Sequence, residues 1–221
     1  MKRVFTLIFL IIDFVPFIFG QDNDSLKNTA QKESSIDLCG VQTTVLSKDF
    51  YGFNFDFKYF PIKRIGTGLY VTYTQSKITD TFTYRIGKPV LDFYEIGWTN
   101  QYDILITEKV RIAVNLNNAI SVARLGDDAI MERRRARYGY TYVPKEIATN
   151  YYYLLEPGAD FSYKLFSFNH VPDVFITAKT KYRFLFGNSK YATTKQFSDY
   201  LFGIGISLIG YTFKTEEHSS K

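Results

Sequence analysis

The stretch Phe50–Phe60, FYGFNFDFKYF, alternates aromatic and polar side chains with a period of two. Side chains of a β-strand point alternately to its two faces, so this pattern predicts a strand with one aromatic face. The aromatic face holds Tyr51, Phe53, Phe55, Phe57 and Tyr59. The opposite face holds Gly52, Asn54, Asp56 and Lys58. Phenylalanine in the middle and tyrosine at both ends is typical of a strand that crosses a bilayer.

The N-terminus has the layout of a secretory signal peptide. Lys2 and Arg3 precede an apolar stretch that ends at Gly20, just before a polar run. This order predicts a signal peptide over residues 1–20 and an exported chain. A retained membrane anchor is the alternative, although a spanning helix needs about 20 apolar residues and Asp13 interrupts this one. No cysteine directly follows Gly20, so we do not expect a lipoprotein.

The rest of the chain has no apolar run as long as a membrane helix, so any membrane crossing must use strands. Backbone groups find no water in a bilayer, and such strands must therefore close into a barrel. Residues 21–35 are polar and predict a flexible lead-in. Cys39 is the only cysteine, which excludes an intrachain disulfide and favours a buried structural thiol.

Eight segments have the length and alternation of membrane strands. They are Cys39–Val45, Phe50–Phe60, Thr67–Ser76, Phe93–Asp103, Val110–Val122, Leu155–Leu165, Val174–Phe184 and Tyr200–Phe213. Short connections alternate with longer ones, except that the first outer connection is also short. The sequence therefore predicts an all-β fold, an eight-stranded antiparallel up-and-down transmembrane β-barrel over residues 36–213. Periplasmic turns are short, outer loops are longer, and residues 214–221 form a polar tail.

The last predicted strand ends in an aromatic-rich stretch, GIGISLIGYTF, that closes with Phe213. With this ending, the chain resembles the small eight-stranded outer-membrane β-barrel proteins of Gram-negative bacteria over Ser35–Phe213. The resemblance implies an outer-membrane location, a surrounding of lipid and lipopolysaccharide, and recognition of the last strand by the barrel-assembly machinery. We expect a monomer that binds no nucleic acid. Two features depart from the pattern: Tyr211 is out of phase with Ile204, and a tail follows Phe213.

The predicted inward faces of the strands carry many charges. They include Asp56, Lys58, Glu95, Arg111, Glu156, Asp160, Lys164, Lys179, Lys181 and Arg183. Because an eight-stranded barrel has room for little besides side chains, these groups predict a paired polar plug that fills the lumen. A selective ion path is the alternative. The excess of cations suggests that anions or water fill part of the space.

The most distinctive outer loop spans residues 124–152 and contains MERRRAR followed by YGYTY. Arginine forks bind phosphates and carboxylates, and tyrosine rings stack on sugars. We therefore predict a binding site for lipopolysaccharide phosphates or acidic glycans. Its residues are Arg133, Arg134, Arg135, Arg137 and Tyr140. The alternative is a solvated loop, in which Ala129–Arg137 is compatible with a short helix.

We predict no enzymatic activity, no catalytic residues, no cofactor and no metal site. The two histidines, His170 and His218, both fall on the predicted periplasmic side, and no nucleophile, nucleotide or metal motif occurs. The predicted role is structural or surface-interacting. One alternative is a lipid-modifying enzyme that uses Asp127 and Asp128. Another is a soluble exported β-barrel that binds an apolar ligand, in which the aromatic face of Phe50–Phe60 would point inward.

Overall fold

The computed structural model describes residues 32–136, 139–167, 172–189 and 191–212. Its strands are β1 Lys32–Val45, β2 Lys48–Ile62, β3 Ile65–Lys77, β4 Pro89–Ile106, β5 Val110–Ala136, β6 Gly139–Phe166, β7 Asp173–Tyr182, β8 Phe184–Phe186 and β9 Tyr200–Thr212. One short helix, α2 (Thr194–Phe197), precedes β9. Among these residues no helix has the length and apolar character needed to cross a membrane.

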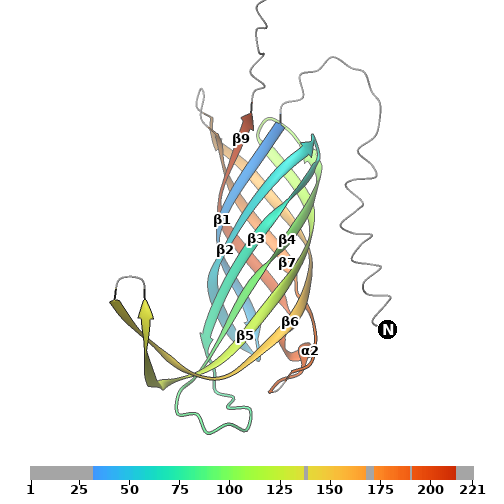
Figure 1. The fold of residues 1–221 in the computed structure, drawn as a ribbon. Helices are drawn as coiled ribbons and strands as arrows, with labels where there is room; N and C mark the ends of the chain where they lie inside the picture. Colours follow the sequence, from blue (N-terminus) through green and yellow to red (C-terminus); the bar gives the residue numbers. More distant parts are fainter. Residues whose placement is uncertain (1–31, 137–138, 168–171, 190, 213–221) are drawn as a thin grey trace, which may run out of the picture.

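The strands form a closed antiparallel barrel (Figure 1). From β1 to β7 each strand pairs with the next one in the chain, β9 pairs with both β7 and β1, and β6 pairs with both β7 and β8. Arg183 separates β7 from β8, and its backbone N–H donates to the carbonyl of Asp199 instead of the ladder. β7 and β8 together are thus one interrupted strand of the barrel. Counted in this way, the described part of the barrel consists of eight strands, as the sequence predicts.

The barrel starts earlier than the predicted boundary at residue 36. Residues 32–35, assigned to the flexible lead-in, form the first part of β1, where Ser35 pairs with Lys58 and with Ile209. The polar composition was misleading because the inward face of this barrel is itself polar. β9 pairs with β1 in an unbroken register up to Thr212. The predicted signal peptide 1–20, Phe213 and the tail 214–221 lie outside the described residues.

β5 and β6 extend beyond the other strands at one end of the barrel (Figure 1). Ala129–Ala136 belong to β5, so the helix considered for this segment is wrong in the described part of the chain. β5 has extra residues between the pairs Asp127↔Lys145 and Met131↔Pro144. Such a bulge bends a two-stranded ribbon. The residues beyond it, Met131–Ala136 and 139–144, are called the arm below.

Glycines on the inward face allow the strands to curve around a narrow lumen. A Cβ on Gly52 would lie 1.7 Å from the carbonyl oxygen of Tyr73 in β3. A Cβ on Gly205 would lie 2.0 Å from the carbonyl oxygen of Leu38 in β1. Because neighbouring backbone occupies that space, no larger residue fits these positions without moving a strand.

Candidate functional site

The aromatic face of β2 points outward. Phe53 and Phe57 are 48% and 44% exposed, whereas Asp56 and Lys58 are each only 3% exposed. Other strands repeat this order, with Ile204 outside on β9. Exposed apolar area of this extent is stable only against lipid or a partner. The orientation confirms the membrane prediction and contradicts the soluble ligand-binding barrel, in which the rings would point inward.

The apolar belt approaches the height of the apolar band of outer-membrane barrels. Tyr51 and Tyr59 are eight residues apart, which gives roughly 26 Å along the strand and about 20 Å along a barrel axis at the usual tilt. At the outer end of the belt, Tyr73 and Tyr94 have ring centroids 4.7 Å apart. Outer-membrane barrels show apolar bands of about 25 Å with aromatic girdles. These strands therefore cross a bilayer.

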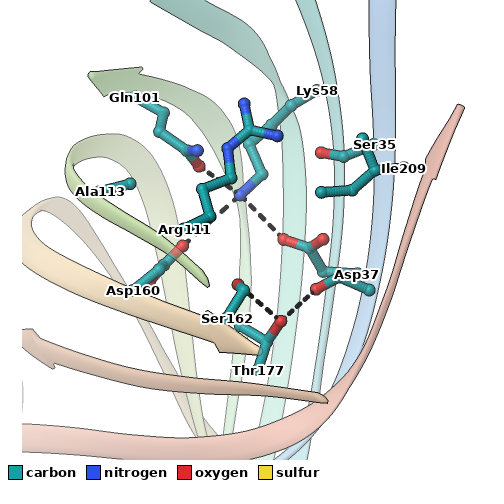
Figure 2. A pocket seen from close by; sticks show the side chains of 11 residues that line it. Ser35, Asp37, Lys58, Gln101, Arg111, Ala113, Asp160, Ser162, Thr177 and Ile209 are labelled. Atoms are coloured by element: carbon teal, nitrogen blue, oxygen red, sulfur yellow. Dashed lines mark hydrogen bonds and ion pairs between the residues drawn. The ribbon is translucent and has the colours of Figure 1, made fainter. Parts of the chain in front are cut away.

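Lys58 is the centre of the ion-pair network in the lumen (Figure 2). Its Nζ lies 2.8 Å from a carboxylate oxygen of Asp37 and 3.5 Å from one of Asp160. The same ammonium donates a hydrogen bond of 2.6 Å to the side-chain oxygen of Gln101. Lys58 comes from β2, while its partners come from β1, β6 and β4. The network therefore links four strands of the barrel.

Lys179 on β7 forms the second node of the network. Its Nζ lies 2.7 Å from Asp37 and also pairs with Asp56. Asp56 accepts a further hydrogen bond of 2.9 Å from the side-chain amide of Asn54. Two buried lysines and two buried aspartates thus alternate, which offsets the cost of removing their charges from water.

Further ion pairs lie on either side of these nodes. Arg111 pairs with Glu33 and Asp103 at the end of the barrel that has short turns. Arg183 pairs with Glu95, and its Nε lies 3.5 Å from Glu156. Opposite charges therefore meet at several levels of the lumen and are not concentrated in one ring.

The predicted excess of lumenal cations is wrong. In the described residues, the inward charges are Glu33, Asp37, Asp56, Glu95, Asp103, Glu156 and Asp160 against Lys58, Arg111, Lys179, Lys181 and Arg183. Glu33 and Asp37 belong to the part of β1 that precedes the predicted first strand Cys39–Val45, so the prediction does not include them. Lys164 lies nearer the rim of the barrel and pairs with Asp173 at 2.5 Å. The carboxylates of the protein therefore supply the negative charge in the lumen that the sequence-based prediction attributes to bound anions.

An apolar cluster closes the lumen at the outer end. Phe197 of α2 is fully buried and packs edge-on against Phe93 at 5.2 Å and Tyr152 at 5.9 Å between centroids. Phe82, from the connection between β3 and β4, joins the same cluster.

Next to Lys58 the ion-pair network lines a cavity of about 10 Å³, which is at the lower limit for one water molecule.

The arm brings together part of the predicted binding site. Directly paired strand residues share a face, so the pairs Met131↔Pro144, Arg133↔Tyr142 and Arg135↔Tyr140 lie on one side of the ribbon. The guanidinium of Arg133 lies 3.6 Å above the ring centroid of Tyr140. We call the set Met131, Arg133, Arg135, Tyr140 and Tyr142 the arginine face. Tyr142 was missing from the prediction, and only the hairpin register reveals it.

Arg134 lies on the opposite side of the arm and does not join the arginine face. Its guanidinium is 3.9 Å from Glu132 and 3.5 Å from Glu146. A hydrogen bond from Thr149, together with Arg134, holds the pKa of Glu146 below its ordinary value. Arg137, the remaining predicted site residue, lies outside the described residues.

The two aspartates considered for catalysis make structural contacts at the base of the arm. Asp127 accepts hydrogen bonds from the backbone N–H groups of Gly87 at 3.0 Å, Lys88 at 2.9 Å and Ala129 at 2.9 Å. These three donors hold its pKa below the ordinary value. Asp128 lies 3.1 Å from the ammonium of Lys77. The Asp127 carboxylate therefore connects the β3–β4 loop to β5, and the Asp128 carboxylate connects β5 to the end of β3.

No group of three or more potential ligands among the described residues is placed to hold a metal ion. His170 and His218 lie outside these residues. Cys39 is 1% exposed and packs with Val41 and Leu201, which confirms the predicted buried thiol.

No protein-family model matches the sequence, and no curated protein matches it. Solved structures do match. The chain is similar to a major outer membrane protein of Thermus thermophilus, with 10% identity, a TM-score of 0.54, and coverage of 81% of this chain and 99% of that one. It is also similar to OprG from Pseudomonas aeruginosa, with 10% identity, a TM-score of 0.47, and coverage of 81% and 96%. Neisserial surface protein A gives 14% identity, a TM-score of 0.45, and coverage of 82% and 97%.

The agreement with the Thermus protein concerns the fold, an antiparallel barrel over most of each chain. The lipid-facing belt and the polar lumen come from the chain's own geometry. Transmembrane barrels with such a belt, short turns at one end and longer loops at the other are of the outer-membrane type. The protein is therefore a bacterial outer-membrane β-barrel with the fold of the small barrels of that membrane.

Proposed function

We propose that this protein is a non-enzymatic barrel whose arm binds anionic groups of lipopolysaccharide or acidic glycans at the bacterial surface. One observation carries the proposal: Arg133 and Arg135 lie side by side with exposed tyrosines on one face of a projecting ribbon. In the described part of the chain neither arginine makes an ion pair with a carboxylate, unlike Arg134. Both guanidinium forks can therefore bind phosphate or carboxylate oxygens.

The lumen supports a structural role for the barrel itself. Ion pairs between Lys58, Lys179 and their carboxylates fill its centre, and the apolar cluster around Phe197 closes its outer end. A conducting path or a reaction site needs an open, water-accessible space. Enzymatic chemistry also needs a free base beside the reacting atom, whereas Asp127 accepts backbone hydrogen bonds from the β3–β4 loop and Asp128 pairs with Lys77.

Binding of purified lipopolysaccharide to the folded protein in detergent micelles tests the proposal. We expect the double variant Arg133→Gln/Arg135→Gln to bind roughly tenfold or more weakly, because each charge-assisted hydrogen bond contributes about 1.5–3 kcal/mol. The variant Arg134→Gln is the matched control, since it removes a single charge from the opposite face of the same ribbon. Equal affinity for the double variant and the wild type would contradict the proposal.

A further inference from the structure

The arm does not continue along the barrel axis. In Figure 1 the ribbon of β5 and β6 leaves the lower end of the barrel sideways, and its far part turns back up, to the left of the barrel in this view. The lower end is the outer one, because the long β3–β4 connection and α2 also lie there. The described part of the arm therefore points back toward the level of the membrane surface and not away from the cell.

The arginine face combines charge with apolar surface. Met131 is 48% exposed, and Tyr140 and Tyr142 are 60% and 64% exposed. A ligand recognised by charge alone would need only the two arginines. Tyrosine rings and basic side chains around an apolar residue are the composition that partitions into the headgroup region of a bilayer.

The other face of the arm has a different character. Arg134 is partly neutralised there by Glu132 and Glu146, and Val143 is the one large apolar residue among the described pairs of that face. A two-stranded ribbon is marginally stable in water without a surface to pack on. The difference between its two faces indicates that the arginine face is the one that packs on another surface.

We propose that the arginine face lies in the headgroup region of the outer leaflet that surrounds the barrel, with Arg133 and Arg135 on lipid phosphates. This inference rests on the proposed function and narrows its ligand to phosphate groups of the protein's own membrane. Three features support it: the backward turn of the arm, the apolar residues of the face, and its two arginines without a carboxylate partner in the described residues. The arm then extends the lipid-facing surface of the barrel beyond its aromatic girdle.

Tryptophan fluorescence in bilayers of brominated phosphatidylcholine, with and without phosphatidic acid, tests this placement. Trp98 is the only tryptophan, so Trp98→Phe provides a silent background. Tyr142→Trp then reports on the arginine face, and Val143→Trp, one residue later, reports on the opposite face. Phosphatidic acid supplies a phosphomonoester, and bromine on the lipid quenches only side chains that enter the bilayer.

We expect a roughly twofold or larger loss of Tyr142→Trp emission when phosphatidic acid is present, since interfacial groups lie about 5–10 Å into the headgroup and acyl boundary. Val143→Trp should retain its emission, and Arg133→Gln/Arg135→Gln should restore that of Tyr142→Trp. Equal quenching at both positions, or none at either, overturns the inference. If quenching is absent while arginine-dependent binding of lipopolysaccharide in detergent persists, the proposed function stands without this placement. If both the quenching and the arginine-dependent binding of lipopolysaccharide are absent, both proposals are refuted.

Discussion

Substitution of Lys179 by methionine should destabilise the barrel strongly. The Lys179 side chain is 1% exposed, and its ammonium joins Asp37 at 2.7 Å to Asp56. After Lys179→Met, Asp37 keeps Lys58 as a partner, but Asp56 keeps only the hydrogen bond from Asn54 in the described network. Removing one partner of a buried ion pair costs about 3–5 kcal/mol, because the remaining charge stays buried without compensation.

The matched control is Lys164→Met, since this lysine also pairs with an aspartate but lies at the rim. The side chain of Lys164 is 22% exposed and pairs with Asp173 at 2.5 Å. Solvent screens such a pair, so we expect a loss of at most about 1 kcal/mol. Adding Asp56→Asn to Lys179→Met should recover much of the stability, because it removes the carboxylate that has lost its partner.

Urea unfolding of the protein in phospholipid vesicles measures these differences. Trp98 faces the lipid and is the only tryptophan, so its emission reports the loss of the folded barrel. From highest to lowest, the expected order of the free energies of unfolding is wild type, Lys164→Met, the double variant Lys179→Met/Asp56→Asn, and Lys179→Met. If Lys179→Met and Lys164→Met had the same free energy of unfolding, the buried network would not hold the walls together.

Three further predictions concern the walls, the outer closure and the loop at the base of the arm. Gly205→Val should prevent normal pairing of β9 with β1. Gly40→Ala, whose Cβ would meet nothing nearer than 3.9 Å, should fold normally. The yield of folded protein on an unboiled gel measures this difference, and equal yields would contradict it. Phe197→Ala should cost about 3–5 kcal/mol and expose the β8–β9 connection to protease, because a fully buried ring is lost; unchanged cleavage would contradict a closing role. Asp127 has a lowered pKa, so its stabilisation of the β3–β4 loop should persist from neutral pH down to about 4 and disappear only at lower pH. Asp127→Asn should increase amide hydrogen exchange at Gly87 and Lys88 near neutral pH, and unchanged protection would refute this anchoring role.

The wall of the barrel could be predicted because each strand carries its own signal. Alternation of Phe53 with Asn54 and of Phe55 with Asp56 defines both faces without knowledge of any neighbour. The start of β1 was missed, since residues 32–35 are polar and no local feature separates a lumen-facing strand from a polar linker. The segment Ala129–Ala136 is rich in good helix formers, but pairing with the other strand of the arm overrides that preference.

The partners inside the lumen could not be predicted in the same way. Lys179 and Asp37 are 142 residues apart, and they meet only because β9 lies between β7 and β1 in the closed ring. Which inward residues share one level depends on the stagger of the strands around the barrel. The division of the arginines between the two faces of the arm likewise depends on the register of Arg135 with Tyr140. Sequence alternation gives the faces of a strand, but contacts between strands need the register.

The most direct test of the central claim is membrane fractionation of the full-length protein in a Gram-negative host, combined with electrophoresis before and after boiling. We expect recovery in the outer membrane and an unboiled band whose mobility shifts on boiling, as for a closed barrel held by ion pairs and lipid contacts. Recovery as a soluble periplasmic protein without such a shift would contradict a membrane-spanning barrel with Phe53, Phe55 and Phe57 in lipid.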